Sequence, residues 1–282
     1  DQDVASLWHY DCARDSLAEV MPADWEIEEI LVSPDGTSLA ISHNVEGKSR
    51  ITIYDANSLK PLHTLQLDDG VADGITWSPD SQSLAFDFDS SLSNSNIYLW
   101  DRQTEAIRQI TTCPQGVPAS ALQSPELIHY KSFDGLEIPA YIYTAQNTRD
   151  PTPPAVLQIH GGPEAQYRPT FDPLIQYMAY HGFTVVVPNI RGSLGYGKAY
   201  EQLDNIEKRL DSIKDIAWLR DHLVAEKVAT PDRVIVRGGS YGGYAVLACL
   251  TFHPELWAAG VSTVGISSLV TFLENTTPYR RG

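Results

Sequence analysis

Residues 234–251 read Val-Ile-Val-Arg-Gly-Gly-Ser-Tyr-Gly-Gly-Tyr-Ala-Val-Leu-Ala-Cys-Leu-Thr. The first residues have the apolar, β-branched character of a buried strand, and residues 241–251 have the composition of a helix. Between them the pattern Gly238-x-Ser240-x-Gly242 is typical of a sharp turn that holds a serine in a strained backbone conformation. Glycine at 238, 242 and 243 removes side chains that would clash there. The turn predicts a nucleophilic Ser240, and the alternative is a serine that only caps the helix.

Strand and helix patterns alternate around this turn. We predict a hairpin over 127–130 and 138–143, then the strands 155–159, 184–188, 233–237 and 258–262 with helices at 171–181, 205–227 and 241–251. Continuous Val/Ile-rich strands separated by amphipathic helices favour an α/β fold with a parallel sheet covered on both faces. In the long helix, one apolar stripe is predicted to face the sheet: Ile206, Leu210, Ile213, Ala217 and Leu223.

A glycine-rich loop follows the strand at 155–159. His160-Gly161-Gly162-Pro163 is similar to the loop that supplies a second oxyanion donor in α/β-hydrolases. Acyl transfer places negative charge on the former carbonyl oxygen, which two fixed N–H groups can stabilise. We therefore expect the backbone N–H groups of Tyr241 and Gly162 to form the oxyanion hole. Gly161 and His160 are expected to shape the loop, rather than His160 to act as a base.

A second glycine-rich stretch resembles a phosphate-binding loop. Gly192 to Ala199 matches the pattern G-x-x-x-x-G-K at every position except the last, where alanine replaces the hydroxyl residue that would hold Mg²⁺. The missing hydroxyl argues against a nucleotide site, and no metal or organic cofactor is expected.

The first half of the chain repeats itself with a period of about 45 residues. The segment 29–40, with Ser-Pro-Asp-Gly at 33–36, returns at 74–85, and Tyr10-Asp11, Tyr54-Asp55 and Trp100-Asp101 each close a short alternating run. This period is typical of a β-propeller blade, and the alternative is a β-sandwich with two similar hairpins. We predict a partial propeller over 1–124, comprising about two blades and the end of a third. The Pro/Ser/Gln-rich stretch 113–125 leads to a second domain at 125–282.

Charge and cysteine content restrict the partners and the compartment. Residues 1–124 carry 20 Asp and Glu against 6 Lys and Arg, out of a formal charge of −16 for all 282 residues. Such an acidic half repels phosphate backbones, so nucleic acid is not expected as a partner. No apolar run reaches the roughly 18 residues that a membrane span needs. Cys12, Cys113 and Cys249 show no metal-binding spacing and favour reduced thiols in a cytoplasmic protein. The oligomeric state is left open.

Three motifs in a fixed order identify a resemblance. Residues 189–197 (Asn-Ile-Arg-Gly-Ser-Leu-Gly-Tyr-Gly), 160–163 and 239–244, preceded by the Ser-Pro-Asp repeats, resemble the prolyl oligopeptidase family of serine peptidases, nearest its acylaminoacyl-peptidase-like branch. The resemblance implies a propeller that precedes an α/β-hydrolase, and cleavage of short peptides through an acyl-enzyme on Ser240. Gly162 and Tyr241 would line the oxyanion site.

No suitably spaced acid and histidine of a catalytic triad come after Ser240 in the sequence. An α/β-hydrolase orders its triad as Ser, Asp or Glu, and then His. Two further strand-helix units would need roughly 60 residues, but 42 residues follow Ser240. His253, Glu255 and Glu274 are poorly spaced for the task. We therefore expect a chain truncated at both ends, with an incomplete hydrolase sheet and little turnover. The alternatives are an esterase on the same scaffold, or a non-catalytic remnant that binds a partner.

Overall fold

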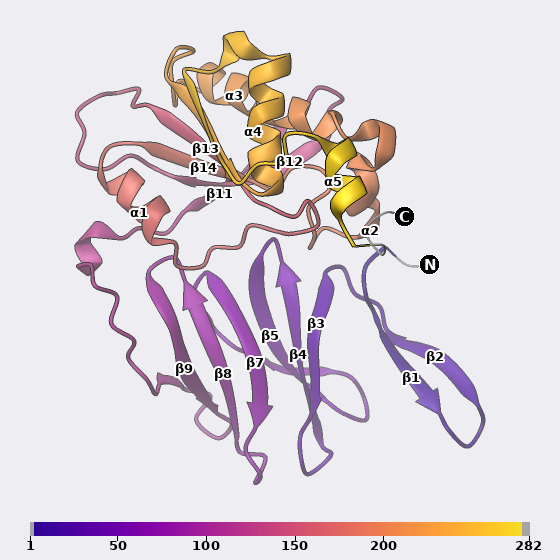
Figure 1. The fold of residues 1–282 in the computed structure, drawn as a ribbon. Coiled ribbons are helices and arrows are strands. Elements are labelled where there is room, and N and C mark those ends of the chain that lie inside the picture. Colours follow the sequence, from indigo (N-terminus) through magenta and orange to yellow (C-terminus); the bar gives the residue numbers. More distant parts are fainter. Residues whose placement is uncertain (1–2, 278–282) are drawn as a thin grey trace. The chain divides into compact units, whose positions relative to one another are not determined.

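The computed structural model describes residues 3–277, which form two compact units. The first unit contains residues 3–125, 168–176 and 194–201, and the second contains residues 126–167, 177–193 and 202–277. Figure 1 draws the chain as a ribbon coloured along the sequence. Each unit is built around its own sheets and is described by itself below.

The first unit consists of antiparallel strands in three groups. A hairpin, β1 and β2, is followed by two four-stranded sheets with the orders β3-β4-β5-β6 and β10-β9-β8-β7. The strand bounds are β1 Leu7–Asp11, β2 Ser16–Met21, β3 Glu26–Val32, β4 Ser38–Val45, β5 Lys48–Asp55, β6 Pro61–Thr64, β7 Gly70–Trp77, β8 Ser83–Ser90, β9 Ser93–Asp101 and β10 Ile107–Gln109. The two equivalent four-stranded sheets agree with the expected last blades of a β-propeller, and the assignment of the hairpin to the end of a third blade stays a prediction.

The sequence repeat forms the same turn in each sheet. Ser33 Oγ donates to Asp35 at 2.6 Å between β3 and β4, and Ser78 Oγ donates to Asp80 at 2.6 Å between β7 and β8. The repeated pair of an aromatic residue and Asp also has a structural role. Asp55 and Asp101 end β5 and β9 and accept backbone N–H bonds from the turns that follow. Asp11 does the same after β1. The repeated polar residues are therefore turn residues that fix the sheet register.

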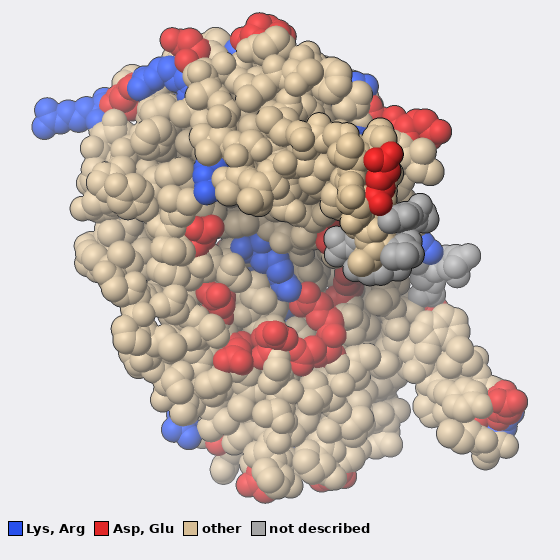
Figure 2. Space-filling model, in the orientation of Figure 1, with Lys and Arg blue, Asp and Glu red and all other residues tan. Residues whose placement is uncertain are grey.

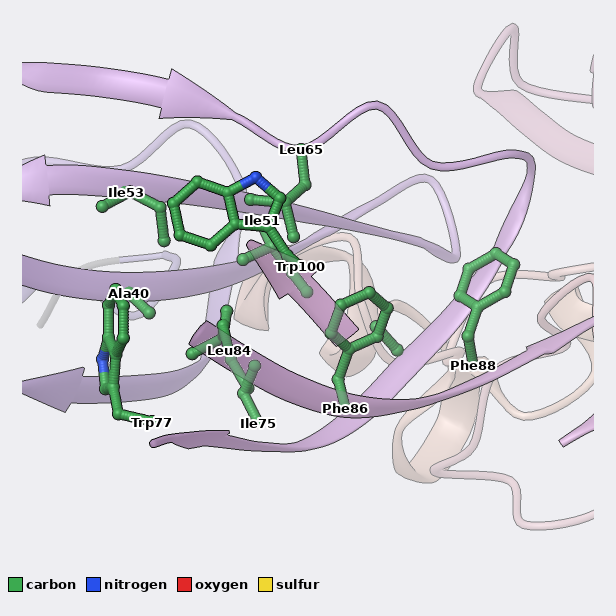
Figure 3. Close-up of a cluster of buried hydrophobic side chains, with 11 residues drawn as sticks. Ala40, Ile51, Ile53, Leu65, Ile75, Trp77, Leu84, Phe86, Phe88 and Trp100 are labelled. Atoms are coloured by element: carbon green, nitrogen blue, oxygen red, sulfur yellow. The ribbon is translucent and has the colours of Figure 1, made fainter. Parts of the chain in front are cut away.

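The core of the first unit lies between its two four-stranded sheets. Figure 3 shows the buried side chains, which include the indoles of Trp77 and Trp100 at a centroid distance of 6.3 Å. Beside this core, Glu29 accepts N–H bonds from Gly74 and Ile75, one repeat away in the sequence. The buried members of the cluster are Ala40, Ile51, Ile53, Leu65, Ala72, Ile75, Trp77, Leu84, Phe86, Phe88 and Trp100.

The acidic excess of the sequence is visible at the surface. On the face drawn in Figure 2, Asp and Glu gather in patches with few Lys or Arg among them. Within the first unit, the pKa of Glu26 is raised by burial and by the like charges of Glu201, Glu28 and Asp3. The negative charges of the neighbouring carboxylates thus make Glu26 harder to ionise.

The second unit contains one six-stranded sheet of order β11-β12-β14-β13-β15-β16. The strands are β11 Glu126–Lys131, β12 Glu137–Tyr143, β13 Ala155–Ile159, β14 Thr184–Pro188, β15 Val234–Gly239 and β16 Ala259–Thr263. The pairs β13/β14, β13/β15 and β15/β16 are parallel, whereas β11/β12 and β12/β14 are antiparallel. The sheet is therefore parallel where the candidate site lies and carries an antiparallel hairpin at one edge.

The helices follow the predicted order. They are α1 Pro173–Tyr180, α2 Lys198–Glu201, α3 Asp211–Ala225, α4 Tyr241–Phe252 and α5 Leu269–Asn275, with 3-10 turns at Ala119–Ala121, Gln202–Asp204, Ile206–Lys208 and Pro254–Leu256. Helices α3 and α4 contact each other, and α4 packs on β13, β15 and β16 (Figure 1). The parallel strands and their helices confirm the α/β-hydrolase part of the expected fold.

The long helix predicted over 205–227 is wrong at its start. Ile206 has a positive φ of 56°, which no α-helix allows, and its side chain is 81% exposed. Leu210 precedes α3 and is also exposed, so neither residue belongs to the buried stripe, although Ile213, Ala217 and Leu223 do. The chain turns here instead of continuing the helix, and the turn brings Asp204 and Arg209 together as an ion pair.

A buried ion network fixes the segment after β14. The guanidinium of Arg191 bonds to both carboxylate oxygens of Asp215 on α3, at 2.8 to 3.1 Å, and to the carboxylate of Asp134. The Arg191 N–H also donates to Asp215 at 3.0 Å, and Ser132 Oγ donates at 2.5 Å. Both Arg191 and Asp215 are buried. The backbone at 191 is therefore held to α3 as well as to the sheet.

Candidate functional site

Ser240 lies in the turn between β15 and α4. Its φ of 55° and ψ of −118° lie outside the regions that a non-glycine residue ordinarily occupies. The turn is held from both sides, because Ser240 N–H donates to Thr263 O of β16 at 3.0 Å and Ser240 O accepts from Tyr244 N–H of α4 at 3.0 Å. Strain of this kind persists only where the surrounding structure imposes it, and it is typical of functional positions.

The Ser240 hydroxyl does not cap the helix. The residue occupies the N-cap position of α4, yet its side chain accepts no bond from the helix amides. The residue is exposed, and within residues 3–277 the hydroxyl has no hydrogen-bond partner. The alternative of a purely capping serine is therefore wrong in its geometry.

Close packing explains the glycines around the turn. A Cβ on Gly238 would lie 2.5 Å from the carbonyl carbon of Gly242, and a Cβ on Gly242 would lie 2.7 Å from His160 O. A Cβ on Gly243 would lie 2.7 Å from the Cα of Gly265. None of these distances can accommodate a side chain, so the three glycines let α4 approach β15, β13 and the chain after β16. Gly265 was not expected to take part, because no motif marks it.

The glycine loop after β13 lies beside Ser240. A Cβ built on Gly161 would be 3.5 Å from Ser240 Cβ, and Gly162 has a φ of 131°, a value that disfavours any side chain. The backbone N–H groups of Gly162 and Tyr241 have no acceptor among residues 3–277. Two donors without protein partners thus belong to the two segments that flank the exposed hydroxyl.

His160 is engaged on both ring nitrogens. Nδ1 lies 2.7 Å from Gly161 O and so carries the proton of that bond, because a carbonyl only accepts. Nε2 lies 2.9 Å from Ser193 Oγ, whose single proton is shared between this nitrogen and Ile190 O, 2.6 Å away. Burial lowers the pKa of His160. The imidazole joins the glycine loop to the segment after β14, and neither nitrogen bonds to Ser240.

Tyr241 has a side chain with a polar environment that the sequence did not reveal. The buried phenol donates to Asp204 Oδ2 at 3.2 Å and accepts from Arg209 Nη1 at 3.2 Å, with Ser212 Oγ at 3.4 Å. The Arg209 guanidinium also lies over the Tyr241 ring, 5.4 Å from its centroid. Burial raises the pKa of Tyr241 to about 12. These partners are 29 to 37 residues away in sequence, and no motif connects them.

The remaining triad candidates are not near Ser240. His253 follows the 12 residues of α4, which places it roughly 18 Å along the helix axis from the Ser240 end. Glu255 belongs to the 3-10 turn after it, and Glu274 to α5. Within the described residues, no acid or imidazole is hydrogen-bonded to the hydroxyl.

The loop that resembles a phosphate site is occupied by an acid. Within the first unit, Asp3 O accepts the Lys198 N–H bond at 2.8 Å, and the Asp3 carboxylate accepts from Ala199 N–H at 2.5 Å. A Cβ on Gly197 would lie 2.6 Å from that carboxylate. Two amides at the end of this loop, those of Lys198 and Ala199, are therefore already bonded to Asp3.

Across residues 3–277, no group of three or more His, Cys, Asp or Glu side chains is arranged to hold a metal ion. In the same residues, no helix has both the length and the apolar character needed to cross a bilayer.

Comparison with known proteins finds relatives along the whole chain. The profile of the prolyl oligopeptidase family matches residues 169–281. Dipeptidyl aminopeptidase BIII of Pseudoxanthomonas mexicana is 42% identical over 130 residues, which are 45% of this chain and 18% of that protein. Dipeptidyl peptidase family member 6 of Caenorhabditis elegans is 26% identical over 280 residues, covering 91% of this chain and 38% of that protein.

Solved structures give the same result for the fold. Puromycin hydrolase superposes with a TM-score of 0.86 at 22% identity, over 96% of this chain and 43% of that chain. A prolyl endopeptidase superposes with a TM-score of 0.79 at 26% identity, over 92% of this chain and 39% of that chain.

The chain spans less than half the length of these relatives. Its matches include dipeptidyl peptidases, prolyl oligopeptidases and an acylaminoacyl peptidase, so they do not single out the expected branch. The profile match, the relatives and the shared fold agree with the order of the sequence motifs. Residues 169–281 match the prolyl oligopeptidase family, and the relatives and solved structures extend the similarity to the residues before them.

Proposed function

We propose that this chain carries the nucleophile and the oxyanion hole of a serine peptidase that hydrolyses short peptides through an acyl-enzyme. The exposed, strained and unpaired hydroxyl of Ser240 is the observation that carries the proposal. Its relatives are named as dipeptidyl peptidases and prolyl oligopeptidases, which favours peptide bonds as substrates. The proposal assigns residues 1–124 to a partial propeller and residues 125–282 to the N-terminal part of the catalytic domain.

The reaction follows from these groups. Ser240 Oγ attacks the carbonyl carbon of the scissile bond while its proton passes to a base, and the carbonyl oxygen becomes an oxyanion. The N–H groups of Tyr241 and Gly162 donate to that oxyanion, an interaction that strengthens in the transition state. The C–N bond then breaks as the leaving amine takes a proton, and water hydrolyses the acyl ester on Ser240. Gly161 and His160 shape the loop, and Gly238, Gly242 and Gly243 support the turn.

The described residues do not supply the base that would accept the Ser240 proton. Without an imidazole at hydrogen-bond distance, a serine hydroxyl is a weak nucleophile. We therefore propose that residues 1–282 alone have little turnover. The free thiols of Cys12, Cys113 and Cys249 favour a reducing compartment, and the proposal places the protein in the cytoplasm.

A fluorophosphonate probe tests the nucleophile directly. In the intact gene product that contains these residues, the probe is expected to label Ser240, and S240A should abolish both labelling and peptide hydrolysis. The same probe on residues 1–282 alone should label little or nothing. An intact gene product that is not labelled would exclude the peptidase, and rapid labelling of the 282-residue chain would exclude its predicted inactivity.

A matched pair of substrates separates the peptidase from the esterase. The same acyl group is presented as a peptide nitroanilide and as a nitrophenyl ester. A peptidase is expected to cleave both through Ser240, whereas hydrolysis of the ester alone would support the esterase on the same scaffold.

A further inference from the structure

The two candidate oxyanion donors are held by one short segment, residues 191–193 after β14. The donors lie on different elements, Gly162 in the loop after β13 and Tyr241 at the start of α4. Neither element fixes the separation between the two amides by itself. Two separate series of hydrogen bonds and close contacts connect the surroundings of these donors to residues 191–193.

The first route runs through the glycine loop. His160, two residues before Gly162, places Nε2 2.9 Å from Ser193 Oγ and Nδ1 2.7 Å from Gly161 O. Ser193 is fully buried and is itself bonded to Ile190 O at 2.6 Å. The imidazole therefore links the carbonyl inside the glycine loop to the segment 191–193.

The second route runs through the Tyr241 side chain. Its phenol bonds to Asp204 and Arg209, and the Asp204 carboxylate is 2% exposed. Asp204 lies directly on Gly192, where a Cβ would be 2.5 Å from its carboxyl carbon, and Gly192 has a φ of 93° that favours glycine. The first residue of α4 is thereby held against the same segment.

The segment itself is buried and anchored by hydrogen bonds. Arg191 uses its guanidinium and its backbone N–H on the buried carboxylate of Asp215, so residue 191 is fixed to α3. Gly192 and Ser193 follow directly, with no intervening residue that could adjust. A support that is buried and hydrogen-bonded is what a catalytic geometry needs to stay within a fraction of an ångström.

We propose that residues 191–193 act as a positioning segment that sets the separation of the Gly162 and Tyr241 amides, through His160 on one side and Asp204 on the other. The proposal rests on the oxyanion role given to those amides under the proposed function. Tyr241 then has two roles. Its backbone N–H would contact the substrate, and its phenol positions that N–H.

Three variants of the intact gene product test the segment. Y241F removes only the phenol oxygen, and S193A removes the hydroxyl that bonds to His160 and to Ile190 O. Y244F is the matched control, because Tyr244 lies on the same helix, is partly buried, and has no hydrogen bond from its phenol among residues 3–277.

The kinetic readout separates positioning from general stability. Y241F and S193A are each expected to lower kcat about 10- to 100-fold with KM within about twofold, because the loss falls on the transition state. The affinity of a peptide boronic acid, which forms a tetrahedral adduct, should weaken by the same factor. Y244F should stay within about twofold of the parent. A rise in KM with kcat unchanged would overturn the proposal.

A structural readout distinguishes failure of this proposal from failure of the proposed function. Hydrogen exchange in the same proteins is expected to rise in residues 160–166 for S193A and in residues 240–246 for Y241F, and in neither for Y244F. Unchanged exchange in both segments would exclude the positioning segment even if the enzyme is an active peptidase. Raised exchange without any fluorophosphonate labelling of the parent would leave the segment standing and exclude the peptidase.

Discussion

The two units use their carboxylates in opposite ways. In the first unit, Asp35 is exposed and Asp55 is partly exposed; both accept bonds from residues two or three positions away and have a lowered pKa because of those bonds. In the second unit, Asp204 and Asp215 are buried and have a raised pKa because burial opposes the charge. Their partners are up to 83 residues away. Local carboxylates shape turns, whereas buried carboxylates join distant segments around the candidate site.

Removing a buried carboxylate should have the largest effect on stability. D215N takes the negative charge from a fully buried partner of Arg191 and leaves that guanidinium with the more exposed Asp134 as its ion-pair partner. Breaking a buried pair from one side costs about 3–5 kcal/mol. Urea denaturation should therefore show a fall of that size in the free energy of unfolding.

The matched control is Asp134, which binds the same guanidinium from a side chain that is 41% exposed. D134N should cost at most about 1 kcal/mol, because solvent screens and replaces an exposed pair. Equal losses in the two variants would show that burial does not separate the two kinds of carboxylate.

A methyl group in the turn should have the next largest effect. G238A places a Cβ against the backbone of Gly242, whereas G239A places one 3.7 Å from Thr263 O, an ordinary contact distance. Overpacking of a tight site costs about 1–3 kcal/mol. We expect G238A to lose that amount in thermal or urea unfolding and G239A to remain near the parent. A destabilised G239A with an unaffected G238A would contradict the packing seen around Ser240.

Lowering the pH should have the smallest effect on stability, and it should act through the turns of the first unit. Bonds from Ser33 and Thr37 lower the pKa of Asp35 from 3.8 to about 2. A lowered pKa means that the turn contributes fully above pH 3.8 and loses its contribution as the pH falls through about 2. D35N should flatten the dependence of the melting temperature on pH between 4 and 2, followed by fluorescence of Trp77 and Trp100.

Asp24 provides the comparison for the acid series. It is exposed in the same unit, and its carboxylate has no hydrogen bond among residues 3–277. D24N is expected to leave the pH dependence of the melting temperature unchanged. A flattening as large as that in D35N would mean that overall charge, and not the turn bonds, controls acid stability.

This contrast also explains what could be predicted from the sequence. The Ser-Pro-Asp turns and the Gly238-x-Ser240-x-Gly242 turn are short, so the residues that form each structure stand side by side in the sequence. The hairpin, the strands and their order were predicted for the same reason, because each element follows from the periodicity of a continuous stretch.

The features that could not be predicted depend on contacts between residues that are far apart in the sequence. The helix expected over 205–227 begins only at Asp211, because the ion pair of Asp204 with Arg209 requires a turn before it. The phenol contacts of Tyr241 and the bond of His160 to Ser193 join residues 29 to 37 positions apart. Periodicity carries no signal for such contacts. Ser193 alone had a signal, since it belongs to the motif at 189–197, but that motif does not name its partner.

The spacing of contacts in the first unit bears on how such a unit can grow. The aspartates that end β1, β5 and β9 each close their own turn, and some contacts between the two sheets span 45 or 46 residues, as for Glu29 with Gly74 and Ile75. Each four-stranded sheet thus carries its own turns, and part of its contact with the next sheet repeats with the period of the sequence. Tandem duplication of about 45 codons would therefore add a module that already contains the residues that close its own turns.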